Sequence, residues 1–381
     1  MTSEQDFGFK VHSLDNAIVA TTSLEVEDQN VIELDFSDYT PLEQFVHNLN
    51  MLPSKSKRVA NKSLSVNGVV VQDRMEKYLN NTSESSSALK QILKTPRHYL
   101  TYKVDELNVK DKSCFELGTF CHSAFLEPKK FKNIIVEPKE TKSTRQGLVN
   151  IIKFYWDILQ KPCVDITPLK QDELKDIYHN LKAEAEASGL TFVKEDHYNI
   201  IKHIGRTYNT YGDGILPKIF SHVKPEVSMY LKDIESGVKV KIRPDAIMLE
   251  ESFGVNGIIS VKTTSATSEE AFMRDAAKFK YELSEGMYLD VATKVTGRKF
   301  TATLMLMLQT VMPYGIALFY WDAEDLEIGK YKYRHALGVL QQCRKEDRWL
   351  GFDCKAENGN HGILPMKLPN YIKLELPPQE L

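Results

Sequence analysis

The feature that most constrains the fold is a pair of short segments, residues 238–245 and 258–264, separated by a turn-forming stretch. In both segments side chains of different character alternate with a period of two, which is typical of β-strands. The stretch between them contains Asn256-Gly257, a pair favoured in tight hairpin turns. The sequence therefore predicts a hairpin whose two strands lie side by side.

One face of this predicted hairpin gathers polar side chains. In the first strand the charged residues all share a face, and they are Lys239, Lys241, Arg243 and Asp245. In the second strand Ser260 and Lys262 share a face with Ile258, whereas Ile259 and Val261 take the other. The hairpin can thus present Asp245, Ser260 and Lys262 to one site, and we expect the function to lie there.

These residues carry a resemblance to a known family. The run Arg243-Pro-Asp245, followed after a gap by Ile259-Ser-Val-Lys-Thr-Thr264, resembles the core of the PD-(D/E)xK nucleases. Within them it is most similar to the exodeoxyribonuclease VIII (RecE-type) branch, whose second strand usually has Asp-Val-Lys-Thr-Thr. Here Ser260 takes the Asp position. The resemblance implies an α/β fold with a restriction-endonuclease-like core, in which helices flank a mixed central sheet.

Two predicted helices extend the resemblance towards the N-terminus. Residues 85–99 begin with capping serines, and Pro96 begins a second short helix. Residues 115–128 form the next predicted helix. Together they resemble the family's "Ser-x-Ser-x-Leu … Ser-Pro-x-His-Tyr" and "Gly-Thr-x-x-His-x-x-Leu-Glu-Pro" patterns, which implies that His122 is a metal-binding histidine. Without the resemblance, a lone histidine on an apolar helix face is more often a core residue.

Phosphodiester hydrolysis explains why such residues would be grouped. The reaction needs an activated water and stabilisation of charge on an anionic phosphate, and Mg²⁺ held by carboxylates provides both. A lysine two residues after the second acid points to the same face of its strand. The resemblance implies Asp245 as the first acid, Lys262 as this lysine, His122 and the Val261 carbonyl as further ligands, and Mg²⁺ or Mn²⁺ as cofactor.

The second acid of this pattern is missing, because Ser260 brings no negative charge and is a poor Mg²⁺ ligand. In one interpretation the chain is a working exonuclease whose charge is restored by Glu226, on a predicted strand over 224–232, or by Glu250 or Glu251. The alternative for Glu226 is an exposed charge at a sheet edge. In a second interpretation the protein is a degenerate nuclease that binds DNA or a partner without cutting. A third is that the serine was introduced to trap an inactive state.

Cations and an aromatic residue near these segments are candidates for DNA contacts. Lys142 and Arg145 lie near the start of a predicted helix over 144–159, and Lys241 and Arg243 lie in the first strand of the hairpin. The family's "Phe-x-Arg … Tyr-x-x-Gln-x-x-x-Tyr" pattern resembles a predicted long helix from Ser268. In this pattern Arg274 and Tyr281 match, whereas Ser284 replaces the glutamine, a second departure. For surface cations generally, a solvated charge is the commoner outcome.

Charge divides the chain unevenly. Residues 1–50 hold ten acidic residues and one lysine, so the rest of the chain has a net charge of +6 although the whole chain is at -3. A mildly basic body suits a polyanion binder. We expect residues 1–64 to form an acidic arm and basic linker, partly disordered or acting as a DNA mimic, and residues 65–381 to form the RecE-type domain.

Other features narrow the function class. The chain has no apolar run long enough to span a bilayer and no secretory signal, and its five cysteines form no CxxC pair, so we expect a cytoplasmic protein. P-loop, dinucleotide-binding and zinc-protease motifs are absent. The resemblance implies double-stranded DNA as substrate, a single-strand annealing protein as partner, homo-oligomers, and a role in recombination or phage replication in a bacterial cell.

The remaining segments predict helices and strands around this core. Residues 140–215 are mostly helical by periodicity, and residues 323–344 form a C-terminal helix. Residues 300–308 and 315–321 are two further predicted strands, joined by a turn at 311–314. In the helix from Ser268, a buried stripe is expected, and it comprises Phe272, Ala276, Phe279, Leu283 and Met287.

Overall fold

The computed structural model describes residues 36–57, 59–104, 112–131, 134–140, 142–357 and 359–367. Its centre is a five-stranded sheet with the strand order β10-β9-β8-β7-β4. The strands are β4 (Lys224–Pro225), β7 (Ala246–Met248), β8 (Asn256–Thr264), β9 (Phe300–Gln309) and β10 (Ile316–Tyr320). Neighbours are antiparallel except β8 and β9, which are parallel, so the sheet is mixed as predicted.

A smaller antiparallel sheet stands beside the first and has the order β1-β5-β6. Its strands are β1 (Val69–Val71), β5 (Ser228–Lys232) and β6 (Lys239–Ile242). The chain therefore crosses twice between the two sheets, once from β4 to β5 and once from β6 to β7. Glu226 lies at the first crossing and Asp245 at the second.

The predicted hairpin is wrong in its first strand. Residues 239–242 pair with β5, and only the three residues after Asp245, in β7, pair with β8. Pro244 lacks an N–H and cannot continue a ladder, which explains why the strand breaks there and restarts in the other sheet. Asn256-Gly257 is also misplaced, because it begins β8, and the turn is made by the short helix α12 (Glu250–Phe253) with Gly254 at a φ of 69°.

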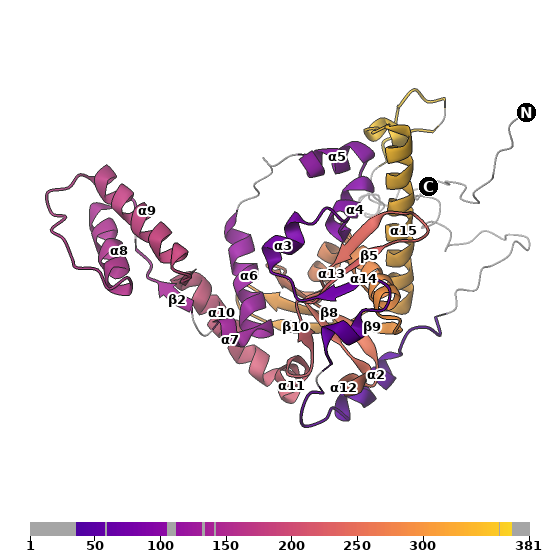
Figure 1. Ribbon diagram of the computed structural model, residues 1–381, viewed down its shortest axis with the longest axis horizontal. Helices are drawn as coiled ribbons and strands as arrows, with labels where there is room; N and C mark the ends of the chain where they lie inside the picture. The colour runs from indigo at the N-terminus through magenta and orange to yellow at the C-terminus, as the bar shows by residue number, and fades with distance from the viewer. Residues whose placement is uncertain are drawn as a thin grey trace, which may run out of the picture.

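Helices cover both faces of the central sheet (Figure 1). Ile258 belongs to the apolar cluster that contains residues of α4, α14 and α15, whereas Ile259 and Val261 belong to the cluster of α2, α6, α10 and α11. The helices are α2 (Leu42–Asn50), α3 (Met75–Asn80), α4 (Ser86–Ile92), α5 (Pro96–Val104), α6 (Lys112–Leu126), α7 (Pro128–Phe131), α10 (Glu195–Thr210), α11 (Ile215–Phe220), α13 (Glu269–Lys278), α14 (Tyr281–Thr296) and α15 (Ala323–Glu346), with short 3-10 turns at Asn61–Leu64, Tyr211–Gly214 and Phe352–Lys355. This α/β layering confirms the predicted fold class.

The single long helix expected from Ser268 is two helices, α13 and α14. The chain turns between them at Lys280, whose φ is 52°, and Phe279 next to the turn is 49% exposed rather than part of the buried stripe. The other four residues of the stripe are buried. The break allows α14 to follow its own direction along the sheet, where it packs closely on α15.

Two helices form an arm that projects from the body (Figure 1). They are α8 (Arg145–Ile158) and α9 (Gln171–Ala187), and a parallel pair of strands, β2 (Ile134–Glu137) and β3 (Thr191–Lys194), stands at their base. The arm has its own apolar cluster, which includes Leu148, Tyr155 and Leu174. The helical character predicted for residues 140–215 is confirmed here.

The predicted acidic arm lies mostly outside the described residues. Its described part includes α2, where Phe45 and Leu49 are buried in the apolar cluster that covers one face of the central sheet. Among the described residues, no helix is both long and apolar enough to cross a membrane. The cysteines that the structure describes, Cys121, Cys163, Cys343 and Cys354, are all free.

Candidate active site

Asp245 is the centre of the site. It directly precedes β7, and its Oδ2 accepts a hydrogen bond of 2.6 Å from the backbone N–H of Val261 on the paired strand β8. Its Oδ1 lies 3.2 Å from Nδ1 of His122, and its Oδ2 lies 3.5 Å from Nζ of Lys262. Burial would raise the pKa of Asp245, but His122 and Lys262 outweigh it and hold the pKa well below the usual range.

Glu226 reaches the same place from the other crossing between the sheets. Its φ is 55°, an uncommon value for a residue with a side chain, and its N–H donates to the Asp245 carbonyl at 2.9 Å. This backbone contact sets the two acids side by side. Arg243 Nε donates to Glu226 Oε2 at 2.6 Å. Burial raises the pKa of Glu226, and the hydrogen bond from Arg243 opposes part of that rise.

His122 comes to the site on α6, which lies close to β8. A Cβ at Gly118, one turn earlier on α6, would meet Thr263 Oγ1 at 3.3 Å, so the glycine allows the helix to approach the strand. His122 is about a quarter exposed at its side chain, like Lys262. Burial would lower the pKa of His122, but the Asp245 carboxylate outweighs it and raises the pKa.

On β8, Ser260 and Lys262 point to one side and Val261 to the other, as predicted from the strand period. Lys262 Nζ donates to the Val261 carbonyl at 3.3 Å and lies 5.6 Å from the centre of the Tyr281 ring. Burial would lower the pKa of Lys262, but Asp245 and Glu285 raise it, so the side chain is an ammonium. Ser260 is fully buried and faces α14.

The donors at the site fit a divalent cation. One ligand atom each from His122, Glu226 and Asp245 lie within 4.8 Å of one another. Two carboxylates and an imidazole are a donor set that Mg²⁺ or Mn²⁺ accepts, and three protein ligands leave positions for water and a phosphate oxygen. The structure thus brings together the helix histidine, both candidate acids and the lysine.

Other candidates lie elsewhere or are engaged within the chain. Glu250 and Glu251, the two further acids considered as replacements, are wrong for that role, because both pair with Arg298 at the far end of β7 from Asp245. Ser284 is buried on α14. Of the three acids considered as replacements, Glu226 is therefore the one that lies at the site.

The candidates for DNA contacts fall into two groups. Lys241 donates to the carbonyls of Tyr78, Leu79 and Asn81, and Arg243 donates to Glu226, Ser228 and the Asp73 carbonyl. Lys142 pairs with Glu137, and Arg145 donates to the carbonyls of Ile166 and Thr167. By contrast Arg274 is exposed on α13. Tyr281 lies beside Lys262.

Sequence reasoning missed two charged residues of the site. Glu285 on α14 is fully buried, and its Oε1 accepts a hydrogen bond from Ser260. Nζ of Lys90 on α4 lies 5.4 Å from the centre of the Tyr281 ring, and Nζ of Lys262 lies over the same ring. The only signal for Glu285 was its place directly after Ser284 in the helix pattern, and Lys90 had none, because an isolated lysine on an amphipathic helix is ordinarily a solvated charge.

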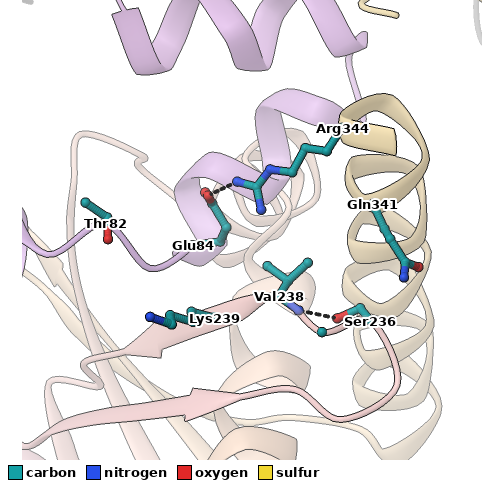
Figure 2. Close-up of a pocket in the computed structure, with 8 residues that line it drawn as sticks. Thr82, Glu84, Ser236, Val238, Lys239, Gln341 and Arg344 are labelled. Carbon is teal, nitrogen blue, oxygen red and sulfur yellow. Dashed lines mark hydrogen bonds and ion pairs between the residues drawn. The ribbon is translucent and has the colours of Figure 1, made fainter. Parts of the chain in front are cut away.

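A separate cavity of about 320 Å³ lies against α15 and shares no residue with the site. Arg344 on α15 and Glu84 both line it and form an ion pair of 2.7 Å. Figure 2 shows the two side chains facing each other. Lys239 of β6 and Gln341 also line the cavity. Because neither a histidine nor a second acid lines the cavity, the chemistry is expected at Asp245 and not here.

The mixed sheet with helices on both faces, and an acid directly before one strand with a lysine on the strand paired with it, define a restriction-endonuclease-like domain of the PD-(D/E)xK class. The chain belongs to the family described as a PDDEXK-like domain of unknown function, whose model matches residues 85–357. The family assignment thus confirms the PD-(D/E)xK resemblance at the level of the superfamily.

Solved structures and curated proteins add little to this assignment. A presumed exonuclease from Eubacterium rectale is 16% identical, with 80% of this chain and 98% of that chain covered and a TM-score of 0.42. A phage-related exonuclease from Haemophilus somnus 129PT is 10% identical, with 72% and 100% covered and a TM-score of 0.25. No curated protein matches the chain. The family model and the site geometry therefore carry the functional argument.

Proposed function

We propose that the protein is a RecE-type exodeoxyribonuclease that digests double-stranded DNA from its ends by metal-assisted hydrolysis. The observation that carries the proposal is the convergence of His122, Glu226 and Asp245 within 4.8 Å, with Lys262 Nζ 3.5 Å from Asp245. A partly buried acid pair beside a lysine suits hydrolysis of an anionic phosphodiester. By the same resemblance we propose a cytoplasmic role in recombination or phage DNA metabolism, with a single-strand annealing protein as partner and a homo-oligomeric assembly.

Each side chain has a role in this proposal. His122, Glu226, Asp245 and the Val261 carbonyl would hold Mg²⁺ or Mn²⁺, which when bound polarises the phosphate and makes its water more acidic. Lys262, kept as an ammonium by Asp245, would orient the scissile phosphate or the attacking water from the same face of β8. Arg243 keeps the Glu226 carboxylate turned towards Asp245, and Arg274 and Tyr281 would contact the DNA.

A second candidate function rests on Ser260. Since this position on β8 holds a hydroxyl, the protein would be a nuclease-fold binder of DNA or of a protein partner that does not cut. Binding without cutting would still depend on salt, because contacts to phosphates release counterions from DNA. The two functions differ in one measurable property, the appearance of nucleotides from a DNA end.

The test is digestion of end-labelled linear duplex DNA by the full chain with Mg²⁺ or Mn²⁺. We expect stepwise shortening from the ends, lost in Lys262→Ala and Asp245→Asn and kept in Lys239→Ala, a matched change of an exposed lysine on β6. Ser260→Asp is measured beside them, because digestion by that variant alone would mean an inactivated site. No digestion by any form, with salt-dependent duplex binding by the wild type, would favour the binder.

A further inference from the structure

The buried pair Ser260 and Glu285 occupies the place where the site lacks an acid. Both residues are fully buried, and Ser260 Oγ donates to Glu285 Oε1 at 2.6 Å. Ser260 stands two residues before Lys262, on the same face of β8, which is the position of the second acid in the PD-(D/E)xK pattern. A carboxylate therefore lies in contact with this strand position, although it comes from helix α14.

The packing of α14 fixes this carboxylate firmly. Gly286, the next residue, lies so close to α15 that a Cβ there would meet the backbone N of Lys330 at 2.4 Å. From the other side, a Cβ at Gly329 would meet the Glu282 carbonyl at 2.0 Å. The two helices thus touch through their backbones, so α14 cannot shift independently of α15.

Glu285 also changes the charge of the site. The negative charge of Asp245 is offset by the Lys262 ammonium, 3.5 Å away. The negative charge of Glu226 is offset by the Arg243 guanidinium, 2.6 Å away. A net charge near zero is unfavourable for binding a divalent cation. Glu285 is a third acid on the Lys262 side, where burial raises its pKa to about 7 although the Lys262 ammonium opposes the rise. In its ionised form it contributes to keeping the Lys262 ammonium charged.

The second oxygen of Glu285 has an unmet requirement. Its Oε2 is buried and has no hydrogen-bond partner among the described residues. A buried carboxylate oxygen without a partner is unfavourable unless a proton or a cation meets it. This orphan oxygen is independent of the contact to Ser260, and it indicates that the pair is arranged for something beyond packing.

We propose that Glu285 supplies the acid that strand position 260 lacks, as a third acidic group of the cation site, and that Ser260 holds its carboxylate there. The strand acid of the PD-(D/E)xK pattern is in effect exchanged with a helix residue. Glu285 lies outside the group of three within 4.8 Å, so it acts from the Lys262 side, adding negative charge beside the three nearest donors. The inference rests on the proposed function, because it assigns a role at the same site.

An exchange of this kind makes a specific prediction for variants. An aspartate at position 260 would extend one bond beyond the serine oxygen and meet the Glu285 carboxylate, so two acids would compete for one place. Ser260→Asp alone should therefore not improve cation binding. Ser260→Asp combined with Glu285→Ala should bind the cation about as well as the wild type does, because the acid then returns to the strand and the helix residue is small.

The experiment is Mn²⁺ binding to the full chain, measured by electron paramagnetic resonance without DNA. We expect Glu285→Gln to weaken Mn²⁺ binding about tenfold or more. Ser260→Asp should bind Mn²⁺ no better than the wild type. The double variant, Ser260→Asp with Glu285→Ala, should have an affinity within about threefold of the wild-type value, a difference of about 0.7 kcal/mol. Glu282→Gln, a buried acid on the same helix that pairs with Lys332, is the matched control and should bind as the wild type does.

The outcomes separate this inference from the proposed function. Wild-type Mn²⁺ binding by Glu285→Gln, with the fold verified by its thermal unfolding, would overturn the role of Glu285 even where the wild type digests DNA. Tighter binding by Ser260→Asp alone would overturn it as well. Weakened binding by Glu285→Gln together with rescue by the double variant supports it, even where no form digests DNA and the exonuclease proposal fails.

Discussion

Nδ1 of His122 lies 3.2 Å from Oδ1 of Asp245, and this contact joins helix α6 to the point where the chain enters the central sheet. The histidine arrives from a helix and the acid from the crossing between β6 and β7, so neither element positions the site alone. Because the imidazole is held by the carboxylate, both side chains are already directed at one place before any cation binds. Preorganisation of this kind reduces the conformational cost of binding.

Removal of His122 tests this arrangement. His122→Ala should weaken Mn²⁺ binding by about 10- to 100-fold, since one of three close ligands is lost. His203→Ala, an exposed histidine on α10, is the matched control and should bind Mn²⁺ as the wild type does. Isothermal titration calorimetry of both variants gives the comparison, and equal affinities would remove His122 from the ligand set.

Arg243 should matter for stability more than for DNA. Its side chain is 8% exposed and donates to Glu226, Ser228 and the Asp73 carbonyl. Arg243→Met would leave the largely buried Glu226 carboxylate without its guanidinium partner, which should lower the free energy of unfolding by about 3 kcal/mol. Arg274→Ala removes an exposed cation and should leave that free energy nearly unchanged.

Urea unfolding and duplex binding by these two variants give the measurements. The expected pattern is a large loss of stability without a specific loss of DNA affinity for the Arg243 variant, and the reverse for Arg274→Ala. A fully stable Arg243→Met that no longer binds DNA would contradict the interpretation of this guanidinium as an internal partner of Glu226.

Lys90 should make DNA binding sensitive to pH. Its Nζ and that of Lys262 lie 5.4 and 5.6 Å from the centre of the same tyrosine ring, that of Tyr281. Burial and the nearby Lys262 ammonium lower the pKa of Lys90 to about 8. The side chain is therefore charged at pH 7 and neutral at pH 9, so attraction to a phosphate declines as the pH rises through that value.

Duplex affinity measured by fluorescence anisotropy at pH 7 and pH 9, at fixed low salt, tests this. We expect the wild type to lose about threefold more affinity than Lys90→Met over this interval, as for one phosphate contact. Lys94→Met, a change of a lysine just beyond the end of α4, is the control. Parallel pH curves for the wild type and Lys90→Met would show that Lys90 does not face the DNA.

The central strands and the convergence of His122, Asp245 and Lys262 could be predicted, because short-range patterns specify them. A period of two places Ser260 and Lys262 on one face of β8, and the serine cap and Pro96 mark the limits of α4 and α5. The crossing at Pro244 was not predicted. An alternating pattern continues on both sides of it, and which sheet a strand joins depends on partners distant in sequence.

Glu285 shows a second limit of sequence reasoning. Its carboxylate meets Ser260 only because α14 turns away from α13 at Lys280 and then packs on α15 through two glycines. A pattern that expected one continuous helix from Ser268 would aim the same residue elsewhere. The absence of an acid at position 260 was visible, but the side chain that stands beside it depends on a helix direction that local periodicity does not determine.

The contact between α14 and α15 should therefore be the most sensitive packing site near the acids. A Cβ at Gly286 would meet the Lys330 backbone N at 2.4 Å and the Gly329 carbonyl carbon at 2.8 Å. Backbone atoms cannot rotate away as a side chain can, so the helices would have to separate. Gly286→Ala should lower the free energy of unfolding by about 3 kcal/mol.

Gly338→Ala on α15 is the matched control, because a Cβ there meets nothing within 4 Å. In an exposed helix interior the same change should raise the free energy of unfolding by about 0.5–1 kcal/mol, since alanine restricts the unfolded chain and favours helix. Chemical denaturation should thus give changes in the free energy of unfolding of opposite sign for the two glycine variants.

Weaker Mn²⁺ binding by folded Gly286→Ala would further follow, because separated helices carry Glu285 away from Ser260. A neutral or stabilising Gly286→Ala would mean that α14 can move freely, and the fixed position argued for the Glu285 carboxylate would then fail.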